Sequence, residues 1–291
     1  MNNIELSTKY LPLLDEVYKN EVKTSVLDGD EATIQKGQNG EIKVAKLDMD
    51  ALGDFSRSSG YTEGSTTLKW ETIKYDKERS EKLKVDRLDN EESLGVMVAK
   101  LSSEFIRTKV APETDAARIA KIASVTGISK KEETITTGDD MYKALRAATN
   151  KMDEDEVSTE NRILFITPTN KALIDDLETY KSKSVMSRFA QVIEVPQTRM
   201  YTAVTLNDGK TIAQGEEKAK FGYTKATGAS DINFLVVEKS AAVTAMDQYI
   251  KYFSPDEDQD GDSHVFPYRN YNLYGHVYEN KLAGVYCSYK G

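Results

Sequence analysis

Three side chains that could bind a metal or act as a nucleophile lie near the C-terminus. His264 and His276 are the two histidines of the chain, and Cys287 is its one cysteine. Their spacing does not match a structural zinc site, and a second cysteine is absent. A cysteine–histidine nucleophile pair has no further support in the pattern. We therefore expect structural roles for all three, and no catalytic, metal-binding or cofactor-binding residue.

Carboxylates alternate along the acidic segment 256–262 (DEDQDGD), as in the first half of a calcium-binding loop. The twelfth position of such a loop needs a bidentate glutamate, and this chain has Pro267 there. The chain also has no phosphate-binding glycine loop, no Gly-x-Ser-x-Gly elbow and no zinc-protease helix. These patterns favour a solvated turn at 256–262 and a protein that is not an enzyme and uses no cofactor.

The amino-acid composition limits the kinds of molecule that the chain is expected to bind. The 39 Lys and Arg residues face 48 Asp and Glu residues, which gives a formal net charge of −9. Tight binding of duplex DNA depends on phosphate neutralisation, so an acidic chain is not expected to bind it through its overall field. Tyrosines are frequent near the C-terminus without interleaved basic residues, which favours core or interface roles over base stacking.

The sequence also indicates a cellular compartment. One cysteine allows no intrachain disulfide, which is typical of a reducing environment. No apolar run approaches the ~20 residues needed to cross a bilayer. The first residues lack the basic and apolar regions of a secretory signal. We expect a protein made in the cytoplasm that has no membrane partner.

The predicted strands point to assembly with other subunits and not to catalysis. The run from Thr66 to Tyr75 is rich in threonine, aromatic and β-branched residues and predicts a strand. Residues 77–82 are charged and suggest a tip, and 83–87 alternate as a return strand would. A two-stranded hairpin is marginally stable alone. We therefore expect this hairpin to lie on another subunit, through Leu68, Trp70, Ile73, Tyr75, Arg79, Leu83, Val85 and Arg87.

Helical and strand patterns follow along the rest of the chain. Apolar residues at helical spacing predict a short helix over 11–25 and a long helix over 91–109, which Pro112 ends or kinks. The part after residue 135 predicts a mixed α/β unit. Its expected strands are 162–166, 192–195 and 232–237, with helices around 141–152, after Thr167-Pro168 and over 241–249, followed by tyrosine-rich strands in the last 25 residues.

The order of these elements resembles the major capsid protein family of tailed bacteriophages, the Hong Kong 97-like family. Segments 52–61, 86–92, 104–116 and 269–286 carry the resemblance, and no one of them is specific alone. It implies an α+β fold with an N-terminal arm, an extended hairpin loop, a long spine helix, and peripheral and axial domains. The implied boundaries are 1–53 for the arm, 54–90 for the hairpin loop, 91–134 for the spine helix and peripheral domain, 135–249 for the axial domain and 250–291 for the returning peripheral strands.

The resemblance implies a structural subunit of an icosahedral virion shell, assembled in the host cytoplasm. Its expected partners are many copies of itself in pentamers and hexamers, a portal protein and a scaffolding protein. Some relatives carry a helical scaffolding segment ahead of the arm, and none fits before residue 50 here. Either the numbering starts at the mature end or the scaffolding comes from elsewhere, and Met1 favours the second if it is a native start.

The subunit would enclose DNA without binding it tightly. Some relatives cross-link a hairpin lysine to a neighbour's asparagine. Lys69, Lys74 and Lys77 lie in the expected hairpin, but lysine is a common residue, so we expect ordinary roles for them. The alternatives are an encapsulin-like nanocompartment shell, and a soluble cation-dependent α/β enzyme or binding protein.

Overall fold

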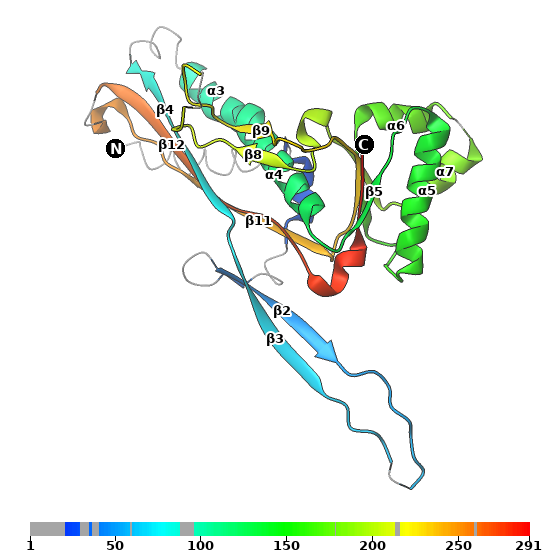
Figure 1. Cartoon of the computed structure of the whole chain (residues 1–291). Coiled ribbons are helices and arrows are strands. Elements are labelled where there is room, and N and C mark those ends of the chain that lie inside the picture. The colour runs from blue at the N-terminus through cyan, green and yellow to red at the C-terminus, as the bar shows by residue number, and fades with distance from the viewer. Residues whose placement is uncertain are drawn as a thin grey trace.

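A computed structural model describes residues 21–29, 35–36, 41–58, 60–87, 96–177, 179–212, 216–258 and 261–291. Residues 11–20 of the helix expected over 11–25 lie outside the described residues, and a 3-10 helix spans Lys23–Leu27. Within the described part, a compact body of helices and sheets carries one long projecting hairpin (Figure 1).

A five-stranded sheet forms the centre of the body, in the order β5-β13-β10-β6-β7. Its strands are β5 (Ser129–Glu132), β6 (Arg162–Ile166), β7 (Gln191–Glu194), β10 (Ile232–Glu238) and β13 (Val285–Tyr289). Every residue of β6 and β10 is buried. Continuous apolar runs are typical of strands covered on both faces, and the expected strands at 162–166 and 232–237 are confirmed.

Helices cover both faces of this sheet. One face packs on α5 (Gly138–Glu154), α6 (Pro168–Asp175) and α7 (Tyr180–Met186). The other face packs on α4 (Ala111–Ser124). The expected cap at Thr167 is confirmed, because its side chain accepts a hydrogen bond from the main-chain N–H three residues on.

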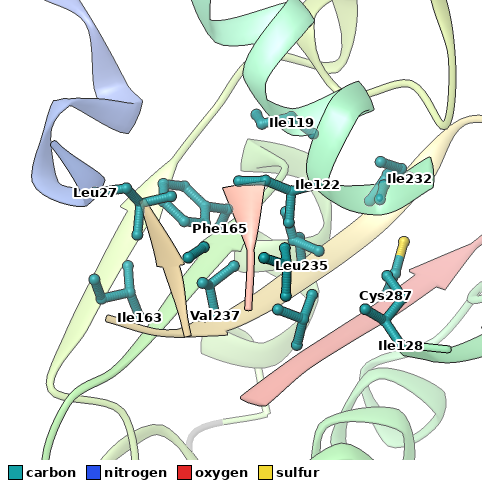
Figure 2. Packing of buried hydrophobic residues seen from close by; sticks show 14 of the residues in the cluster. Leu27, Ile119, Ile122, Ile128, Ile163, Phe165, Ile232, Leu235, Val237 and Cys287 are labelled. Atoms are coloured by element: carbon teal, nitrogen blue, oxygen red, sulfur yellow. The ribbon is translucent and has the colours of Figure 1, made fainter. Parts of the chain in front are cut away.

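The core between α4 and the sheet is apolar. Ile119 and Ile122 of α4 pack with Phe165, Leu235 and Val237 of the sheet (Figure 2). All five side chains are buried, and alternate residues of the same strands point to the opposite helices. The period of two along each strand therefore divides the core into two layers.

The long helix expected before Pro112 is present but contains an irregular turn. α3 (Val96–Phe105) leads through a π-helical turn (Ile106–Val110) into α4, and Pro112 lies in the first turn of α4. Proline has no N–H to donate to the carbonyl four residues earlier, and a local widening of the helix accommodates the missing bond. The helix therefore continues past Pro112.

A second, three-stranded sheet packs on the far side of α4. It consists of β4 (Lys77–Asp86), β11 (Ala242–Ile250) and β12 (Ser263–Val277), in the order β11-β12-β4. The helix expected over 241–249 is therefore wrong. The segment pairs along its length with β12, from Ala242↔Val277 to Ile250↔Tyr268, because partner strands outweigh a helical pattern of apolar residues.

The expected pairing of the hairpin is also wrong. β3 (Thr66–Lys74) pairs with β2 (Glu41–Met49) in nine consecutive positions, whereas β4 pairs with β12. The charged run 77–82 is the start of an edge strand and not a tip. Charged side chains are common on edge strands, where they discourage unwanted pairing, so they do not mark a turn.

The real hairpin is formed by β2 and β3, and its tip is the loop 50–65. β3 continues into β4 across only two residues, so one long line of chain runs from the tip into the three-stranded sheet (Figure 1). β2 and β3 extend away from both sheets of the body. The hairpin therefore contacts the body only at its base.

A buried charge network fixes the segment that precedes the hairpin to α4. The carboxylate of Asp115, fully buried, accepts hydrogen bonds from the N–H of Thr24 at 2.9 Å and its hydroxyl at 2.8 Å, and from Arg199 at 2.9 Å. Arg118, also fully buried, lies 2.7 Å from Asp28. Residues 23–28 are therefore attached to the helix by satisfied charges as well as by packing.

Replacing Asp115 by alanine tests this attachment. The change leaves Arg199 and the buried N–H of Thr24 without their acceptor, so we expect a loss of ~3–5 kcal/mol in the free energy of unfolding. Urea denaturation followed by circular dichroism measures it. The matched control is Asp155→Ala, which removes an exposed ion pair with Lys151 and should cost roughly 0.3–0.5 kcal/mol. Equal losses in the two variants would contradict the network.

The single thiol provides a second test of the core. Cys287 on β13 is fully buried, and burial raises the pKa of its thiol to about 12. The thiolate is the reactive form, so at pH 8 the folded protein should resist maleimide labelling, whereas protein in urea should react. Mass spectrometry measures the labelled fraction. Labelling of the native protein at the unfolded rate would show that β13 is not packed as described.

Candidate assembly surfaces

The chemical side chains near the C-terminus are held in structural contacts. Tyr252 and His264 stack, with 2.7 Å between the phenol oxygen and Nδ1. His276 lies edge-on to Tyr278, and Cys287 lies in the other sheet. Among the described residues, no group of three or more His, Cys, Asp or Glu side chains is placed to hold a metal ion.

Basic side chains lie beside the acidic segment 256–262. Arg87 lies 3.7 Å from Asp256 and 3.5 Å from Asp262, and Lys84 lies 3.4 Å from Asp258. These contacts connect the end of β4 with the turn before β12. In the part of the chain that the structure describes, no helix is long and apolar enough to cross a membrane.

The tip of the hairpin exposes a group of large apolar side chains, which we call the tip patch. Its members are Met49 (64% exposed), Leu52 (104%), Phe55 (60%), Tyr61 (90%) and Leu68 (56%). Several large apolar side chains exposed on one loop and the adjoining strand ends are typical of a binding surface. β1 (Gln35–Lys36) pairs with β2 only near the base, at Lys43 and Ile42, so the outer part of the hairpin is two-stranded and offers no second layer that could cover the tip patch.

The tip has a defined local structure although it is uncovered. The rings of Phe55 and Tyr61 pack edge to face with centroids 5.2 Å apart. The N–H of Ser65 donates to the carboxylate of Asp50 at 2.7 Å, which closes the base of the loop. Gly60 has a φ of +82°, which L side chains rarely adopt. The tip patch is therefore a preformed surface.

Residues at the base of the hairpin are covered by their own subunit. Ile73 is buried against Val243 and Leu273. Tyr75 donates a hydrogen bond from its hydroxyl to Asp247 at 2.7 Å. Ile73 and Tyr75, which the sequence nominated for contact with another subunit, are therefore covered at least in part by their own chain, because β3 passes the end of the three-stranded sheet before it enters β4.

Arg79 joins three separate elements of the body. Its guanidinium donates to Glu113 of α4 at 2.7 and 3.1 Å and to the main-chain oxygen of Asn207 at 2.6 Å. A weaker contact of 3.4 Å reaches the carbonyl of Gly222. Bidentate pairing of this type fixes geometry as well as charge. Arg79 therefore holds the loop between β8 (Val204–Leu206) and β9 (Tyr223–Lys225) against α4.

The remaining nominated residues differ in exposure. Val85 is buried, Leu83 is half-buried, and Leu68 and Arg87 are exposed. The side chain of Trp70 lies outside the described part of the chain. The structure thus separates the eight nominated residues, with Leu68 at the tip and the others from Ile73 onward beside the body.

A groove of about 630 Å³ lies between β4, the helix from α3 to α4, and the β8–β9 loop. Its apolar walls are formed by Leu83, Phe105, Val110, Phe221 and Tyr223. Phe221 remains 67% exposed at the rim. Sequence reasoning missed this groove because segments around residues 80, 108 and 221 meet only in the fold. The tip patch did carry a signal, since Leu52, Phe55 and Tyr61 interrupt a stretch rich in glycine and serine.

No protein-family model matches the sequence, and no curated protein matches it. Solved structures do match over most of the chain. The capsid of the cyanophage P-SCSP1u gives a TM-score of 0.54 at 17% identity, covering 89% of this chain and 85% of that one. The mature capsid of bacteriophage PhiM1 gives 0.55 at 11% identity, covering 88% and 83%.

A structure of a virus-like particle from Pyrococcus furiosus is similar to the same degree. Its TM-score is 0.54 at 12% identity, and the match covers 96% of this chain and 99% of that one. At these identities the likeness shows the fold alone, and it extends over most of the chain. The chain therefore has the α+β fold of the major capsid proteins of tailed bacteriophages, the Hong Kong 97-like fold.

Proposed function

We propose that this chain is the shell-forming subunit of a tailed-phage capsid and acts by assembling with copies of itself. The observation that supports this most is the hairpin of β2 and β3, which projects from a capsid fold and ends in the uncovered tip patch. Apolar surface held away from the body contributes stability only when another molecule covers it. The proposed role is structural and requires no catalysis by the subunit.

The elements correspond to the parts of such a subunit. We assign the arm to the residues before β2, the hairpin loop to β2 and β3, and the spine to α3 and α4. The three-stranded sheet corresponds to the peripheral domain, and the five-stranded sheet with α5 to α7 to the axial domain. This assignment moves the hairpin loop from 54–90 to 41–74 and places β13 in the axial sheet.

The proposed partners follow from this role. Obligate interfaces bury ~2,000–5,000 Å² in total, so each subunit must contact several neighbours through the hairpin, the arm and the body. The formal net charge of −9 suits a wall that encloses DNA without binding it tightly. A portal protein and a scaffolding protein complete the proposed set, with assembly in the bacterial cytoplasm and a final location in the virion.

A shell without a phage genome is the second candidate function. The match to the Pyrococcus furiosus virus-like particle favours it, because that match covers almost all of both chains. The contents of the particle distinguish the two candidates, since both use the same fold.

Purified protein from an expression host should form closed shells or rings visible by negative-stain electron microscopy, with a scaffolding protein supplied if needed. Particles from an infected host that contain DNA support the phage capsid, and particles filled with protein support the second candidate. A stable monomer under all of these conditions contradicts both.

Removing the outer hairpin should separate folding from assembly. The variant replaces residues 46–69 by an Asn-Gly turn. This turn connects Ala45 of β2 to Trp70 of β3, with which Ala45 is paired. It deletes the tip patch but no buried residue of the body. We expect an unchanged circular dichroism spectrum and cooperative melting, with no shells by microscopy.

The matched variant replaces residues 64–85 by a short Gly-Ser turn. It removes Ile73, Arg79 and Val85, which the body buries or binds. Each buried apolar deletion costs ~2–5 kcal/mol against a total of ~5–15 kcal/mol, so this variant should unfold. Normal shells from the first variant would refute the role of the tip patch in assembly, and a folded second variant would refute the packing of β4.

A further inference from the structure

We infer that residues 12–21 form an amphipathic helix that packs on its own subunit, over the seam between the α3–α4 helix and the outer edge of β11. This segment belongs to the arm and directly precedes the described residues 23–28. The inference goes beyond the proposed function, because it assigns this part of the arm to the same copy. Only the residues before it are then left to contact another copy.

The first described residues are fixed on the body. Val22 is 2% exposed and packs with Ile106, Val110 and Tyr268 between the helix and the three-stranded sheet. The carboxylate of Asp115 accepts hydrogen bonds from the next two main-chain N–H groups, at 3.1 and 2.9 Å. Apolar packing and a buried charge together therefore set the point from which the preceding segment starts.

A helix at this position has a short reach. Glu21, the first described residue, is helical. Pro12 suits the first turn of a helix that ends there, because its missing N–H is not needed at that position. In a helix, residues 12–21 extend roughly 15 Å from Val22, against about 33 Å in an extended chain. The segment is therefore confined to the surface close to Val22.

One face of this segment is apolar. Its apolar positions are Leu13, Leu14, Val17 and Tyr18. Spacings of three and four residues place these side chains on one side of a helix. The charged positions on the other side are Asp15, Glu16 and Lys19. A helix this short is marginal alone in water, so it needs an apolar surface under its apolar face.

The outer edge of β11 offers such a surface. β11 is an outer strand of its sheet, and in the described part of the chain its outer edge is paired only at Thr244, by Asp28. Met246 and Ile250, farther along the strand, are only partly buried beside Val22. Proteins commonly cover a free strand edge with a helix, which prevents pairing with other chains. A helix over residues 12–21 covers this edge and both side chains.

Charges on the two sides of the seam are complementary. Glu21 lies close enough to Arg107 of the π-helical turn for their charges to interact. Lys100 on α3 and Lys251 after β11 are exposed, and neither has an ion-pair partner among the described residues. The polar face of the segment contributes two adjacent carboxylates at 15–16. Charge pairs of this kind set orientation more than affinity.

The helix changes which surfaces of a free subunit are open to other copies. A covered edge of β11 cannot pair with a strand of another copy, and the apolar cluster around Val22 stays out of water. The tip patch remains exposed on the same subunit. The helix thus removes a surface for unspecific association and leaves the tip patch available.

Cross-linking between copies of different isotope content tests the inference. The variant carries Asp15→Cys and Lys251→Cys, while the native Cys287 is fully buried. Unlabelled copies and copies labelled with heavy nitrogen are mixed, treated with a short bis-maleimide and digested for mass spectrometry. We expect cross-linked peptides in which both halves carry the same isotope, in free subunits and in assemblies alike. Mixed pairs at the frequency of random combination would overturn the inference, since the helix would then lie on a neighbour.

The control variant carries Asp15→Cys with Tyr180→Cys. Tyr180 is 88% exposed and belongs to α7, which covers the face of the five-stranded sheet opposite α4. It should give no cross-link within one copy. Equal yields in the two variants would also overturn the inference. Free subunits decide this inference even when the parent protein forms no shell, a result that would contradict the proposed function alone.

Hydrogen exchange on the free subunit provides the second measurement. Val17→Asp places a charge on the apolar face, so the N–H groups of residues 245–250 should exchange at least about tenfold faster, while those of β10 keep their rate. Lys19→Asp places the same side chain on the polar face and should change the exchange rate less than about twofold. Circular dichroism shows whether both variants are folded. Equal exchange in the two variants would overturn the inference, because β11 would then not depend on the apolar face of the arm.

Discussion

The junction between β3 and β4 is the constraint on which the rest of the structure depends. A single line of chain changes partners there, from β2 on one side to β12 on the other. Asp76 holds the crossing point. Its carboxylate accepts from Lys121 of α4 at 2.8 Å and from the N–H of Tyr274 at 2.9 Å, and its own N–H donates to Asn272 at 2.8 Å. The direction of the hairpin is therefore set by contacts with the helix and the sheet together.

α4 is the second element that several parts share. One face of it packs on the five-stranded sheet, another on β12, and Asp115 and Arg118 attach residues 23–28. Buried charges contribute little net stability, but they require their partners in one arrangement. A shift of α4 therefore moves residues 23–28, the junction between β3 and β4, and the helical wall of the groove together. The π-helical turn before Pro112 lies next to this shared region.

Patterns among residues close in sequence predicted the core, but they could not predict which strands pair with each other. Apolar runs at 162–166 and 232–237, and the cap at Thr167, depend on residues close in sequence, so the pattern contained them. The partner of β3 lies across the loop 50–65, and the partner of β4 lies some 190 residues away, as Asn272↔Lys77 shows. Neither choice is encoded in local spacing. The groove needs three such distant segments at once, and for that reason no pattern in the sequence could indicate it.

The exposed tip patch makes a free subunit less stable than a subunit whose patch is covered. Each apolar side chain left in water forgoes ~1.5–3 kcal/mol that burial would supply. A monomeric protein would gain by folding the tip back, but the junction at Asp76 and the nine-pair ladder of β2 and β3 prevent it. The stabilisation can be recovered only from a neighbour that covers the patch. Rigidity at the base of the hairpin thus converts an unfavourable monomer surface into a driving force for association, with its direction already fixed.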